Sequence, residues 1–200
     1  MILKETENWL VIAKPSGLHT VKAKDSNSLS IEDWLMTERP QQRQLPECGI
    51  LHRLDEPTSG CLLVAKNLKT YDLLKSKMQG QGLQKTYYAL VEGKCASGKF
   101  SLYFSSRYKG SKKVSVSPKG KPKEYGECEW KQIRYQNGLS LLKVQLLGPG
   151  KRHQIRAGLA SLGHPIRGDV LYGATPSEKA FGLHAFSLAW DRHRIECPTN

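Results

Sequence analysis

The chain has 200 residues, and 38% of them are hydrophobic, which is enough to build one continuous core in a single domain. Lys and Arg (31) outnumber Asp and Glu (18), so the formal net charge is +13 at pH 7, and no apolar run reaches the roughly 20 residues of a membrane span. We therefore expect a cytoplasmic protein with a nucleic-acid partner and no membrane contact, although charge alone fits a ribosome-bound or merely basic protein equally well.

The first part of the chain is predicted to alternate strands and helices. The apolar run 9–14 (WLVIAK), closed by a Pro-Ser-Gly turn, predicts a buried strand. Residues 28–39 predict a helix that Ser30 caps, because apolar side chains recur there at helical spacing. A strand at 61–66 (CLLVAK) and a second helix that begins after Asn67 follow.

From residue 85 onward, β signals predominate. We expect strands at 85–93, 100–104, 114–117, around Trp130, at 139–147, and in a closing pair at 183–190 and 194–197. One later helix interrupts them, with Ile155, Leu159 and Leu162 on one face and Gly163 as its stop. This pattern predicts an α+β fold with a mixed, mainly antiparallel sheet and flanking helices and loops.

One stretch departs from the average composition, and we call it the basic segment (residues 107–123, RYKGSKKVSVSPKGKPK). It holds seven basic residues and no acidic ones, so it is predicted to be an exposed hairpin or loop. A solvated charged loop is the simpler interpretation. The overall charge favours RNA contact instead, with Lys112 and Lys113 as phosphate-binding candidates.

Asp55 is the candidate for chemistry, because it follows an apolar stretch and precedes a Pro-Thr-Ser-Gly turn that leads into the strand at 61–66. Burial would raise the pKa of such a carboxyl group, whereas a nearby guanidinium from Arg53 or Arg156 would keep it ionised as a base or nucleophile. A turn cap or a structural ion pair is the alternative for one aspartate taken alone.

A second basic cluster consists of Lys151, Arg152 and Arg156, in and just before the first turn of the later helix. Free backbone amides at a helix start suit a phosphate, although a solvated helix face is also compatible. Arg152 and Arg156 are four residues apart, which predicts that both lie on one side of the helix.

Metal and disulfide chemistry find no support in the sequence. The five cysteines include no C-x-x-C pair, and the six histidines form no H-E-x-x-H motif. A metal-dependent nuclease or deaminase acting on RNA is therefore disfavoured, and we expect no metal and no organic cofactor.

Several segments together resemble one family. HRLDEPTSG (52–60) is similar to the H-R-L-D-x-x-T-S-G signature of the RluA class of pseudouridine synthases, whose RsuA relatives typically have glycine in place of His52. KPSGLHT, KTYYALVEG, GPGKRHQIR, LGHPIRGDVLYG and LHAFSLAW resemble the other motifs of the class in the same order.

The resemblance implies a pseudouridine synthase fold with a central RNA-binding cleft, and isomerisation of uridine in ribosomal or transfer RNA without a cofactor. By matching position, Asp55 is the catalytic aspartate, Tyr87 lies against the target base, and Arg156 pairs with the aspartate. Arg53 holds the position that enters the RNA helix as the uridine leaves it. Lys112, Lys113, Lys151 and Arg152 are the further RNA-binding candidates.

Three departures from the family pattern stand out. After Gly150, Lys151 holds the usual arginine position, and its neighbour Arg152 is an added arginine. Gly158 stands where a histidine is common, and Glu56-Pro57 replaces the more usual basic-acidic pair. We expect residues 1–200 to form one catalytic domain without a separate N-terminal RNA-binding domain, and to act as a monomer. A catalytically inactive RNA-binding homologue that serves in ribosome or RNA assembly is the alternative function.

Overall fold

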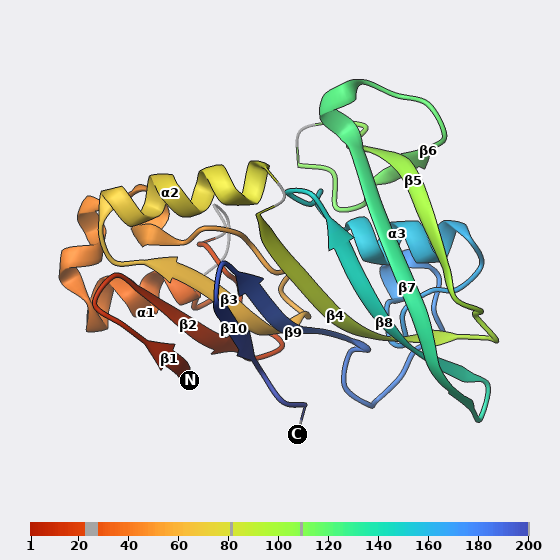
Figure 1. The fold of residues 1–200 in the computed structure, drawn as a ribbon. Coiled ribbons are helices and arrows are strands. Elements are labelled where there is room, and N and C mark those ends of the chain that lie inside the picture. The colour runs from red at the N-terminus through yellow and green to blue at the C-terminus, as the bar shows by residue number, and fades with distance from the viewer. Residues whose placement is uncertain (23–27, 81, 109, 200) are drawn as a thin grey trace. The chain divides into compact units, whose positions relative to one another are not determined.

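The structure is a computed structural model that describes residues 1–22, 28–80, 82–108 and 110–199. It divides into two compact units, residues 1–83 with 184–200 and residues 84–183. Each unit contains helices and strands, and the strands pair mainly in antiparallel fashion (Figure 1). The predicted α+β class with a mainly antiparallel sheet is confirmed, whereas the single domain and the central cleft stay predictions.

The first unit contains five strands: β1 (Ile2–Glu5), β2 (Trp9–Lys14), β3 (Ser59–Ala65), β9 (Leu183–Trp190) and β10 (His193–Glu196). Antiparallel pairing joins β1 to β2, β2 to β3, and β9 to β10. A short parallel pairing joins β3 to β9, where Gly60 lies opposite Ala185. A Cβ atom on Gly60 would lie within 2.7 Å of the Ala185 backbone, so only glycine permits this close approach.

Two helices of this unit begin where the sequence predicts. In α1 (Ile31–Glu38), the Ser30 side chain accepts a hydrogen bond from the backbone N–H of Asp33, and the Asp33 carboxylate accepts the N–H of Ser30 in return. Asn67 caps α2 (Leu68–Gln79), and Gly80 ends it. The short 3-10 turns η1 (Pro40–Gln44) and η2 (Pro46–Gly49) follow α1.

The core of the first unit lies where α2 packs on β2, β3 and β9. Trp9 and Trp190 meet edge to face there, with ring centroids 5.0 Å apart. Leu74 and Met78 of α2 belong to the same buried cluster. Because Leu10 and Ile12 on the other face of β2 are also fully buried, β2 is covered on both faces, which explains its continuous apolar run.

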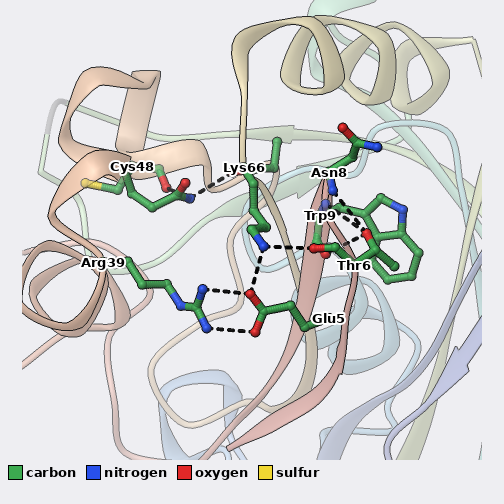
Figure 2. A network of polar contacts seen from close by, with 9 residues as sticks. Glu5, Thr6, Asn8, Trp9, Arg39, Cys48 and Lys66 are labelled. Atoms are coloured by element: carbon green, nitrogen blue, oxygen red, sulfur yellow. Dashed lines mark hydrogen bonds and ion pairs between the residues drawn. The ribbon is translucent and has the colours of Figure 1, made fainter.

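The N-terminal strand, which the sequence did not predict, is fastened by polar contacts that Figure 2 shows. The Arg39 guanidinium donates two hydrogen bonds of 2.8 Å to the Glu5 carboxylate, and Lys66 Nζ lies 2.9 Å from the same group. These two bonds from Arg39, followed by the one from Lys66, hold the pKa of Glu5 below its usual range. Glu5 thus links β1 to two other segments of the unit.

The second unit is an antiparallel sheet with a hairpin at one edge. Its strands are β4 (Leu83–Glu92), β5 (Gly98–Ser105), β6 (Ser115–Ser117), β7 (Tyr125–Gln136) and β8 (Leu139–Leu147). They pair in the order β4, β8, β7, β5, β6. The 3-10 turns η3 (Pro122–Glu124) and η4 (Val170–Tyr172) lie in the connections.

Helix α3 (Gln154–Ser161) packs on this sheet, and Gly158 permits the contact. A Cβ atom at Gly158 would lie 2.3 Å from the Phe100 ring of β5. Any side chain at this position, including the histidine expected from the family pattern, would therefore require Phe100 or the helix to shift.

Two details of α3 differ from the sequence-based expectation. The helix ends at Ser161, and Leu162, its C-cap residue, is 48% exposed, whereas Ile155 and Leu159 are buried. The helix begins only at Gln154, because His153 adopts a left-handed backbone conformation (φ 54°). Arg152 therefore lies outside the helix, and the helical i,i+4 relation predicted between Arg152 and Arg156 is wrong.

Candidate active site and RNA-binding residues

Asp55 lies in the first unit on a loop whose backbone is fixed on both sides. Thr20 donates its hydroxyl to the Leu54 carbonyl oxygen (2.7 Å) and accepts the Leu54 N–H (3.0 Å). On the other side, the Thr58 N–H donates to the Asp55 carbonyl oxygen (3.0 Å), which closes the turn before β3. The Asp55 residue itself is half-buried. A carboxylate in this place combines a rigid backbone with partial shielding from water.

Buried Lys14 supports the same loop through hydrogen bonds. Its Nζ donates to three carbonyl oxygens, those of Pro15 (2.9 Å), Leu18 (2.6 Å) and Glu56 (3.0 Å). The ammonium therefore joins the turn after β2 to the residue that directly follows Asp55. Burial lowers the pKa of Lys14 to about 8, while the charges of Asp55 and Glu56 act in the opposite direction.

Further contacts tie the two turns and the following strand together. The Gly17 N–H donates to the Glu56 carbonyl oxygen (2.9 Å), and the Ser16 hydroxyl donates to the Pro57 carbonyl oxygen (2.7 Å). Ser59 Oγ lies 2.8 Å from His184 Nδ1, and His184 Nε2 lies 2.8 Å from a backbone carbonyl oxygen. Because a carbonyl only accepts, Nε2 carries a proton, and in the neutral ring Ser59 donates to Nδ1.

Arg53, the candidate for entering RNA, is exposed and engaged in an ion pair. Its Nη2 lies 2.5 Å from Glu47 Oε1, and 59% of the Arg53 side chain is accessible to solvent. Glu47 and Cys48 both have left-handed backbone conformations (φ 47° and 53°), which are uncommon for these residue types. Exchange of the Glu47 carboxylate for an RNA phosphate would keep the Arg53 charge paired.

Arg156 and Tyr87 belong to the second unit. Tyr87 lies on β4 opposite Val144 of β8, and it is buried. Arg156 is buried in α3 and binds Asp169 through two hydrogen bonds, from Nε (2.7 Å) and from Nη2 (2.9 Å). Its guanidinium also lies over the ring of Tyr172, with 5.4 Å between its carbon and the ring centroid. The pairing of Arg156 with Asp55 joins residues of different units and stays a prediction.

The other RNA-binding candidates gather near the start of α3. Arg152 Nη2 donates to the Ser111 carbonyl oxygen (2.5 Å), and Lys151 Nζ donates to the Lys123 carbonyl oxygen (2.7 Å). Both contacts join the α3 start to the basic segment. Arg107, Lys112 and Lys113 are exposed and line an open cavity of about 590 Å³, together with the neighbouring residues Tyr108, Gly110, Ser111 and Ser115. The structure thus brings the two predicted basic clusters together.

The basic segment, predicted to be an exposed hairpin or loop, supplies one strand of a hairpin, because β6 pairs with β5, which precedes the segment. Its exposure is only partly as predicted, since Ser111 and Val114 are buried while Lys112 and Lys113 between them are exposed. Buried anchors that flank exposed charges are a better phosphate-binding arrangement than a solvated loop, because the charges lose less freedom on binding.

Four residues that the sequence patterns did not single out make supporting contacts in the structure. Lys14 and Asp169 support the candidate catalytic residues, and Tyr172 contacts Arg156. Lys85 Nζ donates to the Pro149 carbonyl oxygen (2.6 Å) in the loop before α3, and burial lowers the pKa of Lys85 to about 8. All four lie inside the quoted family motifs, which was the available signal.

The described residues contain no group of three or more His, Cys, Asp or Glu side chains that could hold a metal ion. Within the same part of the chain, no helix is long and apolar enough to cross a membrane.

Comparison with known proteins agrees with the order of the motifs. The sequence pattern described as RNA pseudouridylate synthase matches residues 8–161. The chain belongs to this family. It is an RluA-type member, because its similar curated relatives are ribosomal large subunit pseudouridine synthases C and D.

Two of these relatives show the extent of the similarity. Over 202 residues, the chain is 34% identical to the ribosomal large subunit pseudouridine synthase C of Pasteurella multocida. This alignment covers 95% of this chain and 60% of the relative. The chain is 32% identical over 175 residues to the synthase D of Nitrosomonas europaea, which covers 87% of this chain and 50% of that protein. The chain thus spans about half of the length of these relatives, 50% and 60%.

Among solved structures, the human RNA pseudouridylate synthase domain containing 4 covers the whole chain and 88% of its own, with a TM-score of 0.78 at 18% identity. The human domain containing 1 gives a TM-score of 0.71 at 21% identity. These similarities establish the fold.

Proposed function

We propose that this chain isomerises uridine to pseudouridine in ribosomal RNA, with Asp55 as the catalytic carboxylate. The observation that carries the proposal is the support of Asp55. The loop around it is bonded on both sides, and the buried ammonium of Lys14 binds the adjacent carbonyl oxygen. Ribosomal RNA is the proposed substrate because the curated relatives are named for the large ribosomal subunit.

The proposed reaction conserves all atoms of the substrate. The bond between N1 of uracil and C1′ of ribose breaks, the detached base rotates, and a bond forms between C5 and C1′. The proton on C5 is lost, and N1 gains one. Because no group or electron leaves the substrate, the proposal includes neither a metal nor an organic cofactor.

The other site residues have complementary roles in this proposal. A uridine inside a helix is out of reach, so the base must leave the stack, and Arg53 enters the RNA in its place. Tyr87 lies against the uracil and assists removal of the C5 proton. Arg156 keeps Asp55 ionised and correctly aimed, because a buried carboxylate without a positive partner tends to take up a proton.

RNA contact in this proposal comes from Lys112, Lys113, Lys151 and Arg152. Their support is the contact between the α3 start and the basic segment, which gathers these positive charges on one side of the second unit. Ribosomal RNA offers phosphates to each of them.

The test compares Asp55→Asn with Glu56→Gln, which removes one negative charge from the next residue. Both proteins are incubated with ribosomal and with transfer RNA from cells that lack the gene, and pseudouridine is measured by mass spectrometry. We expect product in ribosomal RNA with the wild type and with Glu56→Gln, and none with Asp55→Asn, while RNA affinity changes less than about threefold. Chelators should leave the wild-type rate unchanged.

Product from Asp55→Asn, with deamidation back to Asp excluded by the protein mass, would show that another residue is catalytic. RNA binding by the wild type without product in either RNA would favour an inactive RNA-binding homologue. Product in transfer RNA alone would replace the proposed substrate.

A further inference from the structure

Tyr172 joins two segments that are far apart in the sequence. Its side chain is buried, and its hydroxyl accepts the backbone N–H of Val114 at 2.9 Å. The same oxygen lies 2.9 Å from Nδ1 of His153. Val114 belongs to the basic segment, and His153 directly precedes α3. One phenol group therefore connects the basic segment to the start of the helix that carries Arg156.

A second contact braces the same turn. Arg152 donates to the Ser111 carbonyl oxygen, and the Ser111 hydroxyl donates to the Lys113 carbonyl oxygen (2.7 Å). Buried Ser111 and Val114 are thus fixed at the two ends of a turn. Lys112 and Lys113, the exposed lysines, stand between these ends, so their backbone positions depend on both contacts.

Tyr172 also contacts the support of Arg156. The Tyr172 N–H donates to the Asp169 carbonyl oxygen (2.9 Å), and the Asp169 carboxylate holds Arg156 through two bonds. The ring lies 5.4 Å from the Arg156 guanidinium carbon and 5.4 Å from Lys113 Nζ, measured to its centroid. Two cations from different segments therefore meet one aromatic ring, which attracts each of them.

We propose that Tyr172 is a positioning residue that sets the basic segment and Arg156 in one fixed arrangement, so that RNA contact at Lys112 and Lys113 is made in register with Arg156. A buried N–H without a partner is costly, so the Val114 bond favours the docked turn. The functional half of this proposal, the register between RNA contact and Arg156, rests on the proposed function, whereas the docking of the turn does not.

The test uses Tyr172→Phe, which removes one hydroxyl and keeps the ring. Tyr135→Phe is the matched control, because Tyr135 is a tyrosine of the same unit that is 47% exposed on β7. Hydrogen exchange of the Val114 amide reports docking without RNA. We expect exchange at Val114 to accelerate about tenfold or more in Tyr172→Phe, a factor that corresponds to loss of one buried hydrogen bond. The control should exchange like the wild type.

RNA measurements test the functional half. For Tyr172→Phe we expect a shallower dependence of log affinity on log salt concentration, by about one unit, as a displaced lysine loses its phosphate. Single-turnover product formation at saturating RNA should fall about tenfold, because Arg156 loses its register with the bound RNA. Tyr135→Phe should match the wild type in both measurements.

His153→Asn provides a second variant from the helix side, since asparagine tolerates the left-handed backbone of this position. We expect the same direction of change in Val114 exchange. Unchanged Val114 exchange in both variants would overturn the docking. Faster Val114 exchange with wild-type salt dependence and turnover would show that Tyr172 only holds the turn. The proposed link between RNA contact at the lysines and Arg156 would then be overturned. A wild type that makes no pseudouridine refutes the proposed function, and the exchange result then stands by itself.

Discussion

Lys14→Met tests whether a buried ammonium supports the Asp55 loop. Methionine has a similar length but cannot donate hydrogen bonds, so the carbonyl oxygens of Pro15, Leu18 and Glu56 lose their donor. Each bond from a charged donor contributes about 1.5–3 kcal/mol, and relief from the buried charge offsets part of the loss. We expect the free energy of unfolding to fall by about 2–3 kcal/mol at neutral pH.

The pH dependence gives the sharper signature. In the folded protein, burial lowers the pKa of Lys14 from 10.5 to about 8. Between these values the unfolded chain binds more protons, so the stability of the wild type rises with pH, by up to about 3 kcal/mol from this group. Lys14→Met lacks this gain. The destabilisation caused by the substitution should therefore grow by up to about 3 kcal/mol between pH 7.5 and 10.5.

The measurement is urea unfolding of both proteins at several pH values, with Lys69→Met, which changes an exposed lysine of α2, as the control. Lys85 has a similar pKa, but it is present in all three proteins, so its contribution cancels in the differences. A difference between wild type and Lys14→Met that stays constant from pH 7.5 to 10.5 would refute a buried, charged Lys14 with a lowered pKa.

Three further variants test other parts of the structure. Asp169→Asn should lower the free energy of unfolding by about 3–5 kcal/mol in urea titrations, because it removes the charge of the buried carboxylate that binds the Arg156 guanidinium through two hydrogen bonds; a loss below 1 kcal/mol would contradict a buried ion pair. Thr58→Val should raise it by about 1 kcal/mol, because the buried Thr58 hydroxyl has no hydrogen-bond partner among the residues that the structure describes; thermal unfolding at a lower temperature than the wild type would count against this. Changing Lys112 and Lys113 together to Gln should weaken RNA binding and reduce the salt slope by about one unit for each phosphate that the variant no longer binds; an unchanged slope would assign the basic segment to solvated surface.

Local sequence patterns predicted the elements whose stability is local. Residues 9–14 form β2 because a continuous apolar run suits a strand that is covered on both faces. Ser30 and Asn67 cap α1 and α2 because their side chains bind amides only three residues away. The order of the family motifs predicted the family, because comparing motifs along the chain requires no distances in the folded structure.

Local sequence patterns gave wrong or missing predictions where contacts between distant residues determine the backbone conformation. The late start of α3 depends on the left-handed conformation of His153, whose ring lies against Tyr172, 19 residues further along the chain. The β1 strand was missed because its sequence, ILKE, is short and mainly exposed, and contacts of Glu5 with Arg39 and Lys66 hold it. Such contacts leave no periodic trace in a sequence.

By itself, the sequence determined the α+β class, the family and the candidate catalytic residues, because these follow from residue type and order. Only the tertiary structure decided what supports those residues: the carbonyl oxygen that follows Asp55 meets Lys14, 42 positions away from it, and Arg156 meets Asp169. Tyr172 meets Val114 across 58 positions. The physical reason is that a buried charge or amide must find a partner wherever the folded chain brings one within hydrogen-bonding distance, and sequence separation does not limit that search.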